Sequence, residues 1–118
     1  MEVVTFELLF KALRNSIGAL GVDDETIRMY TEIILGFFGF GDYVLDNVLS
    51  KEERDLFYML EEMGILKTRT EEITIKRGKL WRTHYWVLNK ERIKELAEKR
   101  IEEEERIRIY EKIFGEEL

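Results

Sequence analysis

The residues of this chain that could do chemistry are six basic side chains in one short segment of its second half. They are Lys67, Arg69, Lys76, Arg77, Lys79 and Arg82. Basic side chains grouped in this way bind phosphate groups, and each phosphate contact on a duplex contributes about −0.9 to the slope of log affinity against log salt. Trp81, Tyr85 and Trp86 lie in the same part of the chain, and aromatic rings stack on the bases of single strands. The segment is therefore a candidate nucleic-acid surface.

Both groups of residues also have a plainer structural interpretation. The basic residues could form ion pairs with acidic residues of the C-terminal helix or of a second subunit. Alternate residues of a strand face opposite sides of a sheet, so one set of the aromatic side chains must pack on the helices. We expect most of these aromatic residues in the core, with one tryptophan partly exposed.

A catalytic role has less support in the sequence. His84 is the one histidine. It would lie near Glu71 or Glu72 in a hairpin that turns at Arg77-Gly78, and a His–Glu pair can transfer protons. A cross-strand ion pair is the commoner use of such residues. With no cysteine and one histidine, zinc sites and histidine-dependent nucleophiles are nearly excluded. We therefore expect no enzyme, no metal and no cofactor.

A glycine-rich segment at residues 36–42, GFFGFGD, resembles a phosphate-binding loop only superficially. A P-loop follows a strand and has a Lys-Ser/Thr pair after its last glycine. This segment has no such pair and lies between two predicted helices. We interpret it as the end of a helix followed by a close turn. The Glu-rich runs likewise lack the spacing of a calcium-binding loop.

The charges are unevenly distributed along the chain. Residues 1–63 hold 5 basic and 13 acidic side chains, residues 64–92 hold 8 and 3, and residues 93–118 hold 6 and 9. The net charge of the chain is −6, whereas the middle segment carries +5. Such asymmetry is typical of a nucleic-acid-facing element on an acidic body, although pairing within the protein would produce it too.

The elements that would position the basic segment are a helix, a glycine stop and a two-stranded hairpin. Ser50 and Glu53 have the spacing of a capping box. The apolar residues that follow recur on one helical face as far as Gly64, which favours the left-handed conformation that ends helices. The Thr- and Ile-rich segment 67–76 predicts one strand and the aromatic segment 80–88 predicts its partner, with a tight glycine turn between them.

Three more helices are predicted before this one. The first runs from about Thr5 to Leu20, and the second starts at a cap formed by Asp23 or Asp24 and has a wide apolar stripe. A short third helix covers residues 43–49. This helix, a brief turn and the capped helix form a helix-turn-helix pattern.

Asn89 caps a last predicted helix, which reaches about Phe114. Some 25 helical residues make a rod about 38 Å long, which a domain of this size cannot cover. Exposed apolar surface on its far half indicates a partner. We predict an antiparallel helix pair in a homodimer, with an interface formed by Ile101, Ile107, Tyr110, Ile113 and Phe114. The alternative is that the helix folds back on its own domain.

The composition places the chain among globular proteins. It has 118 residues, of which 45% are hydrophobic and 37% are charged. No stretch approaches the ~18 apolar residues of a membrane span, and the N-terminus lacks the apolar run of a signal peptide. We therefore expect a cytoplasmic protein. The abundance of Glu, Lys and Arg resembles a hyperthermophile's surface, although the lack of proline argues mildly against this origin.

The order of these elements resembles the winged-helix domain over about residues 24–88. The stretches DNVLSKEERDLFYMLEEMGIL and WRTHYWVL are also similar to a family of small uncharacterised archaeal proteins. The resemblance implies that segment 50–63 occupies the recognition-helix position and Lys76-Arg77-Gly78-Lys79 the wing tip. That helix is poorly suited to read bases, because it offers two basic residues against five carboxylates.

We therefore predict an α+β, mostly helical chain. Residues 1–88 form a winged-helix-like domain with an extra N-terminal helix and a basic hairpin, and residues 89–118 form a long C-terminal helix. The function that fits best is a DNA-associated, transcription-related homodimer that uses the basic wing. The alternative is a protein-interaction or regulatory homodimer without nucleic-acid contact, which the acidic helix and the net charge of −6 favour.

Overall fold

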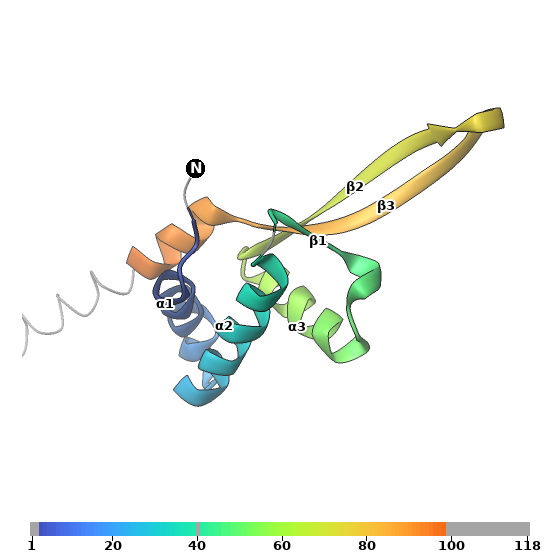
Figure 1. The fold of residues 1–118 in the computed structure, drawn as a ribbon. Coiled ribbons are helices and arrows are strands. Elements are labelled where there is room, and N and C mark those ends of the chain that lie inside the picture. Colours follow the sequence, from blue (N-terminus) through green and yellow to red (C-terminus); the bar gives the residue numbers. More distant parts are fainter. Residues whose placement is uncertain (1–2, 40, 99–118) are drawn as a thin grey trace, which may run out of the picture.

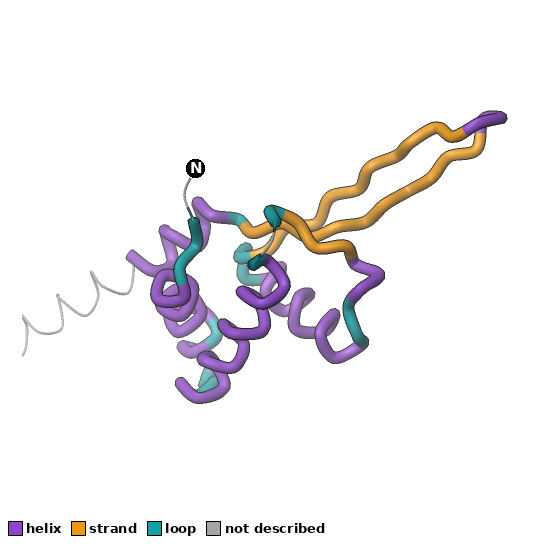
Figure 2. Tube along the Cα trace, viewed as in Figure 1, coloured by secondary structure: helices purple, strands orange, loops and turns teal. Residues whose placement is uncertain are grey.

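The computed structural model describes residues 3–39 and 41–98, which form an α+β fold (Figures 1 and 2). Its α-helices are α1 (Phe6–Ser16), α2 (Asp24–Phe38), α3 (Lys51–Glu62) and a helix over residues 90–98. Its strands are β1 (Tyr43–Leu45), β2 (Leu66–Ile75) and β3 (Lys79–Leu88). Short 3₁₀ turns follow α1, β1 and β2 at Gly18–Leu20, Asp46–Val48 and Lys76–Gly78.

The strands form an antiparallel sheet in the order β1-β3-β2. β2 and β3 pair along their whole length, from Leu66 opposite Leu88 to Ile75 opposite Lys79. β1 pairs only with the base of β3, where Val44 lies opposite Trp86. The outer part of the hairpin therefore has no third strand and extends away from the helices (Figure 1).

The predicted short helix over residues 43–49 is wrong. Residues Tyr43–Leu45 form β1, and only the 3₁₀ turn Asp46–Val48 is helical. Aromatic and β-branched residues fit a pleated surface well, and the edge of β3 offers Val44 a buried site beside Trp86. The expected two-stranded hairpin is thus part of a three-stranded sheet.

The start and end of α3 follow its sequence signals. The Glu53 backbone N–H donates to the Ser50 hydroxyl (3.1 Å), and the Ser50 backbone N–H donates to the Glu53 carboxylate (2.8 Å). The predicted capping box is therefore confirmed. Gly64 has a φ of +82° just after the helix, a conformation that glycine adopts without steric cost.

The two N-terminal helices begin at side-chain caps, Thr5 for α1 and Asp23 for α2. Hydrogen bonds from the Thr26 hydroxyl and backbone N–H lower the pKa of Asp23. α1 ends at Ser16, earlier than predicted, because the chain tightens into a 3₁₀ turn. The Ser16 hydroxyl donates to the carbonyl of Ala12 (2.8 Å), a local bond that competes with helix continuation.

The core lies between the helices and the base of the sheet. Phe57 of α3 is fully buried at its centre, with ring contacts to Phe37, Phe38 and Trp86 at 5.4–6.2 Å between centroids. Aromatic pairs at such distances add to the stabilisation from burial. α3 is thereby held between α2 and β3.

The helix over residues 90–98 packs on α1. Ile93 and Ala97 are buried, and the Asn15 side-chain amide donates to the carbonyl of Leu96 (2.7 Å). The Arg92 backbone N–H donates to the Asn89 side chain (3.3 Å), so the predicted cap is present. The predicted dimer residues (Ile101, Ile107, Tyr110, Ile113 and Phe114) lie outside the described residues.

Candidate nucleic-acid interface

The hairpin has two faces, and its register determines which side chains share them. Residues directly opposite in an antiparallel pair point to the same side, and successive pairs alternate. Trp86 points toward α3, where its ring meets Phe57 and Tyr58 at 5.4 and 5.3 Å. The pair Ile73–Trp81 lies five positions along the hairpin from the pair Thr68–Trp86, which is an odd number. Its side chains therefore point to the other side of the hairpin.

The six basic residues predicted as one surface are separated by the fold. Lys76, Arg77 and Lys79 lie together at the tip. Lys67 and Arg69 lie at the base, seven or more residues along β2 from the tip, which is about 23 Å or more at 3.3 Å per residue.

The basic residues also differ in whether a carboxylate neutralises them. Arg82 Nε forms an ion pair with the Glu72 carboxylate across the strands (2.8 Å). In the described part of the chain, no ion pair includes Lys76, Arg77 or Lys79. Lys67 and Arg69 likewise have no ion pair within the described residues, but they lie at the base of the hairpin, so the tip carries three of the five basic side chains of this group without an ion pair. The connecting turn contains Arg77 and Gly78 at φ values of 70° and 72°.

The two tryptophans have opposite environments. Trp86 is 2% exposed and belongs to the core, whereas Trp81 is 60% exposed. The expectation of core aromatics with one exposed tryptophan is confirmed for this pair. Ile73, Ile75 and Leu80 are also exposed near Trp81 on the outer hairpin. The tip therefore combines positive charge with exposed apolar side chains. The sequence placed the basic residues at the wing tip, but it missed this apolar face, because the exposure of Ile73, Ile75 and Trp81 depends on the outer hairpin extending away from the helices.

His84 does not form the expected pair with a glutamate. It lies opposite Thr70, and its Nδ1 is 3.1 Å from the Thr70 hydroxyl. Glu72 pairs with Arg82, and Glu71 accepts a hydrogen bond from the Tyr85 hydroxyl (3.1 Å). Both glutamates are therefore engaged elsewhere, and the proposed acid–base pair has no geometric support.

The Tyr85 hydroxyl has a raised pKa. Burial disfavours its ionised form, and the hydrogen bond to Glu71 adds to this effect. Its ring also contacts Tyr43 of β1 at 5.5 Å between centroids. Tyr85 thus helps to fasten the base of the hairpin and stays neutral at ordinary pH.

Asp46 connects the base of the hairpin to α3. Its Oδ1 accepts hydrogen bonds from the Trp86 indole N–H (3.0 Å) and from Arg54 Nε (3.2 Å). Its backbone carbonyl accepts a further hydrogen bond from Arg54 (3.0 Å). Arg54, one of two basic residues on α3, therefore serves the structure. Sequence reasoning missed Asp46, because its partners are 8 and 40 residues away.

The outer face of α3 is acidic. Glu52, Asp55 and Glu62 are exposed, and Lys51 is the only other basic residue of the helix. A duplex lying along this face would bring phosphates close to carboxylates and be repelled. The hairpin tip is therefore a better candidate for nucleic-acid contact than α3.

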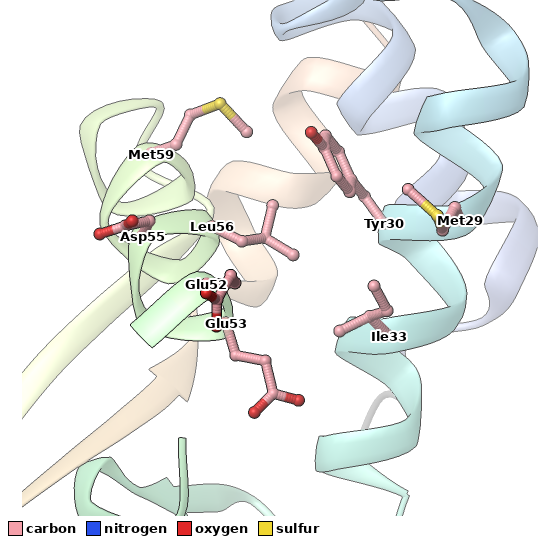
Figure 3. Close-up of a pocket in the computed structure, with 8 residues that line it drawn as sticks. All are labelled: Met29, Tyr30, Ile33, Glu52, Glu53, Asp55, Leu56 and Met59. Atoms are coloured by element: carbon pink, nitrogen blue, oxygen red, sulfur yellow. The ribbon is translucent and has the colours of Figure 1, made fainter. Parts of the chain in front are cut away.

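A groove lies between α2 and α3 (Figure 3). Its volume is about 410 Å³. Apolar side chains of both helices line it, and three carboxylates of α3 border it. The apolar residues are Met29, Tyr30, Ile33, Leu56 and Met59, and the acidic ones are Glu52, Glu53 and Asp55. Leu56 points across the groove toward Tyr30 and Ile33.

A second hollow lies in the angle between α3 and the hairpin. Its volume is about 410 Å³, and it is lined by polar and aromatic residues that include Glu61, Thr70 and His84. The Thr68 hydroxyl donates to Glu61 across it (3.2 Å). This hollow lacks the positive charge that a phosphate ligand would need.

The family comparison covers nearly the whole chain. A model described as a family of unknown function, DUF6015, matches residues 2–117. The chain belongs to this family. No curated protein matches the chain. Function in this DUF6015 chain must therefore be argued from its geometry.

Across residues 3–39 and 41–98, no group of three or more His, Asp or Glu side chains is placed to hold a metal ion. None of the helices in these segments has the length and apolar character needed to cross a membrane.

Proposed function

We propose that this DUF6015 chain is a winged-helix-type module that binds nucleic acid through the tip of its hairpin. The observation that carries the proposal is the tip itself, which extends away from an acidic body. Its three basic residues, Lys76, Arg77 and Lys79, form no ion pair with any residue of segments 3–39 and 41–98. Nucleic acid, which is negatively charged, would approach the tip and avoid α3.

The order of elements supports the winged-helix assignment. A helical body leads into α3 and then into the hairpin, which is the order in which a winged-helix domain has its recognition helix and its wing. One departure is that a single 3₁₀ turn at Asp46–Val48 replaces the first helix of the helix-turn-helix pattern. Contacts from α3 to base edges form no part of the proposal, because its outer face is acidic and Arg54 is paired with Asp46.

The exposed ring of Trp81 favours single strands over duplexes. Trp81 lies two residues from Lys79 on β3. A single nucleic-acid strand that is held at the tip by its phosphates therefore passes close to an aromatic face. Base–aromatic stacking contributes about 1–3 kcal/mol per base. We therefore expect tighter binding to a single strand than to a duplex of the same length.

The test is fluorescence anisotropy with labelled single and double strands at two salt concentrations. Three phosphate contacts give slopes of about −2.7 for duplex and −2.1 for single strands. A rise from ~50 to ~200 mM salt should then weaken duplex binding ~40-fold and single-strand binding ~20-fold. Absence of binding at the lower salt would refute the proposal.

Variants assign the binding to the tip. The triple variant Lys76→Ala/Arg77→Ala/Lys79→Ala should abolish the salt-dependent binding. The matched control replaces three lysines of the body, which are Lys11, Lys51 and Lys90. It changes the net charge equally and should retain most of the affinity. Equal losses in the two variants would mean that net charge alone, and not the tip, drives association.

A second candidate function is a protein-interaction module without nucleic-acid contact. The exposed apolar cluster of Ile73, Ile75 and Trp81 on one face of the hairpin favours it, because exposed apolar patches mark interaction sites. The groove between α2 and α3 supplies a second such surface. Failure to bind both single-stranded and double-stranded nucleic acid would make this candidate the leading one.

A further inference from the structure

The groove between α2 and α3 is an apolar site with a negative border (Figure 3). Its apolar lining includes the thioethers of Met29 and Met59, which adapt their shape to a guest. Glu52 and Asp55 are exposed at its border, and within the described segments no ion pair includes either of them. A guest for this site should present apolar side chains flanked by positive charge.

The hairpin tip has that combination of side chains. Ile73, Ile75 and Trp81 belong to pairs on one face of the hairpin, as does Lys79. Lys76 and Arg77 occupy the turn beside them. An apolar cluster with basic residues at its end thus matches an apolar groove with carboxylates at its border. Complementary charge of this kind selects partners and fixes their orientation.

The tip of one chain cannot reach the groove of the same chain. Pairing of β3 with β1 and the contacts of Trp86 with Asp46 and α3 fix the base of the hairpin. From that base the hairpin extends away from α2 and α3 (Figure 1). Each strand has ten residues, about 33 Å in length. The tip is therefore placed to reach a neighbouring molecule.

We propose that the groove between α2 and α3 binds the hairpin tip of a second copy of this chain. This proposal deepens the second candidate function by naming the partner. Trp81, Ile73 and Ile75 enter the apolar groove, and Lys76 and Lys79 face Glu52 and Asp55. Two such contacts related by a two-fold axis close a dimer, whereas a one-way exchange would give a filament.

The first measurement is the assembly state of the full chain by sedimentation between ~1 μM and ~1 mM, a range that covers weak and moderate affinities. Association should shift Trp81 emission to shorter wavelengths as its ring leaves water. The Trp81→Phe variant supplies the background signal from Trp86. A monomer throughout this range would overturn the proposal.

Charge reversal tests whether the tip and the groove are the two halves of one contact. The tip variant Lys76→Glu/Lys79→Glu and the groove variant Glu52→Lys/Asp55→Lys change only exposed side chains, and circular dichroism checks that each still folds. Each variant alone should be monomeric, since its tip and groove now repel. An equimolar mixture should form a dimer, because the tip of each variant then meets a groove of opposite charge.

Two outcomes would overturn the proposal. One is wild-type association in either variant, which would place the contact on another surface, including the C-terminal segment outside the described residues. The other is a mixture that stays monomeric although both variants are folded. The groove variant separates this proposal from nucleic-acid binding, because it loses self-association while its unchanged tip should still bind strands.

Discussion

Replacement of Asp46 by alanine should destabilise the protein more than any other exposed or half-buried charge change. The Trp86 side chain is 2% exposed, and its indole N–H would lose its protein acceptor at a partly buried site. A buried donor without a partner costs about 1–3 kcal/mol. The ion pair with Arg54 adds about 0.5 kcal/mol, because both side chains are about one-third exposed. We therefore expect a loss of about 2–3 kcal/mol.

The assay is equilibrium unfolding in urea followed by circular dichroism. Asp42→Ala is the matched control, since the Asp42 side chain is 76% exposed and its ion pair with Lys90 is long, at 3.9 Å. The Asp42→Ala variant should lose less than about 0.5 kcal/mol of unfolding free energy. Asp46→Asn should be milder than Asp46→Ala, because its amide oxygen can still accept from the Trp86 indole.

The reasoning would be refuted by an Asp46→Ala variant as stable as the Asp42→Ala control. That result would mean that the Trp86 N–H finds another acceptor or does not need one. Arg54→Ala separates the two contributions, because it removes the ion pair and leaves the indole bond. A loss in Arg54→Ala equal to that in Asp46→Ala would place the effect in the contacts of Arg54 with Asp46, which include its hydrogen bond to the Asp46 carbonyl, and not in the indole bond.

Three further predictions concern the ends of helices. Ser50→Ala removes one bond of the capping box and should cost about 1 kcal/mol in urea unfolding; no change would show that Glu53 alone caps α3. Gly64→Ala places a Cβ at positive φ, 3.2 Å from the Arg92 side chain, and should lower stability by about 1–2 kcal/mol. The control Gly36→Ala, in an open helical site, should not lower it. The lowered pKa of Asp23 means that its contribution is present above the ordinary pKa of 3.8 and is lost as pH falls through the folded value. Asp23→Asn should therefore flatten the decline of thermal stability on acidification, and an unchanged decline would exclude Asp23 as its source.

Local signals in the sequence predicted the helices well. The bonds between Ser50 and Glu53 depend on residues three positions apart, so the spacing alone indicates them. Gly64 ends α3 for an equally local reason. Residues 43–45 were misassigned because a short apolar run fits a helix and a strand equally. Only the pairing of this segment with β3, 40 to 44 residues away, makes it a strand.

The candidate site could be predicted only in part. The sequence supplied the basic residues, but the register of β2 against β3 decides which of them are neutralised. That register places Arg82 opposite Glu72 and His84 opposite Thr70. The groove between α2 and α3 was not predicted, because the burial of an apolar stripe depends on how closely the facing helix packs.

The two proposals make competing demands on the same tip. Lys76 and Lys79 face phosphates in one and the groove carboxylates of a second copy in the other, so a tip seated in a groove cannot hold a strand. Linkage requires that bound nucleic acid lower the dimerisation constant by the same factor by which dimerisation lowers the affinity for nucleic acid. The affinity of each subunit for a nucleic-acid strand should then fall as the concentration of the wild-type protein rises. The Glu52→Lys/Asp55→Lys variant should show no such fall, and equal behaviour of the two proteins would mean that the tip serves a single partner.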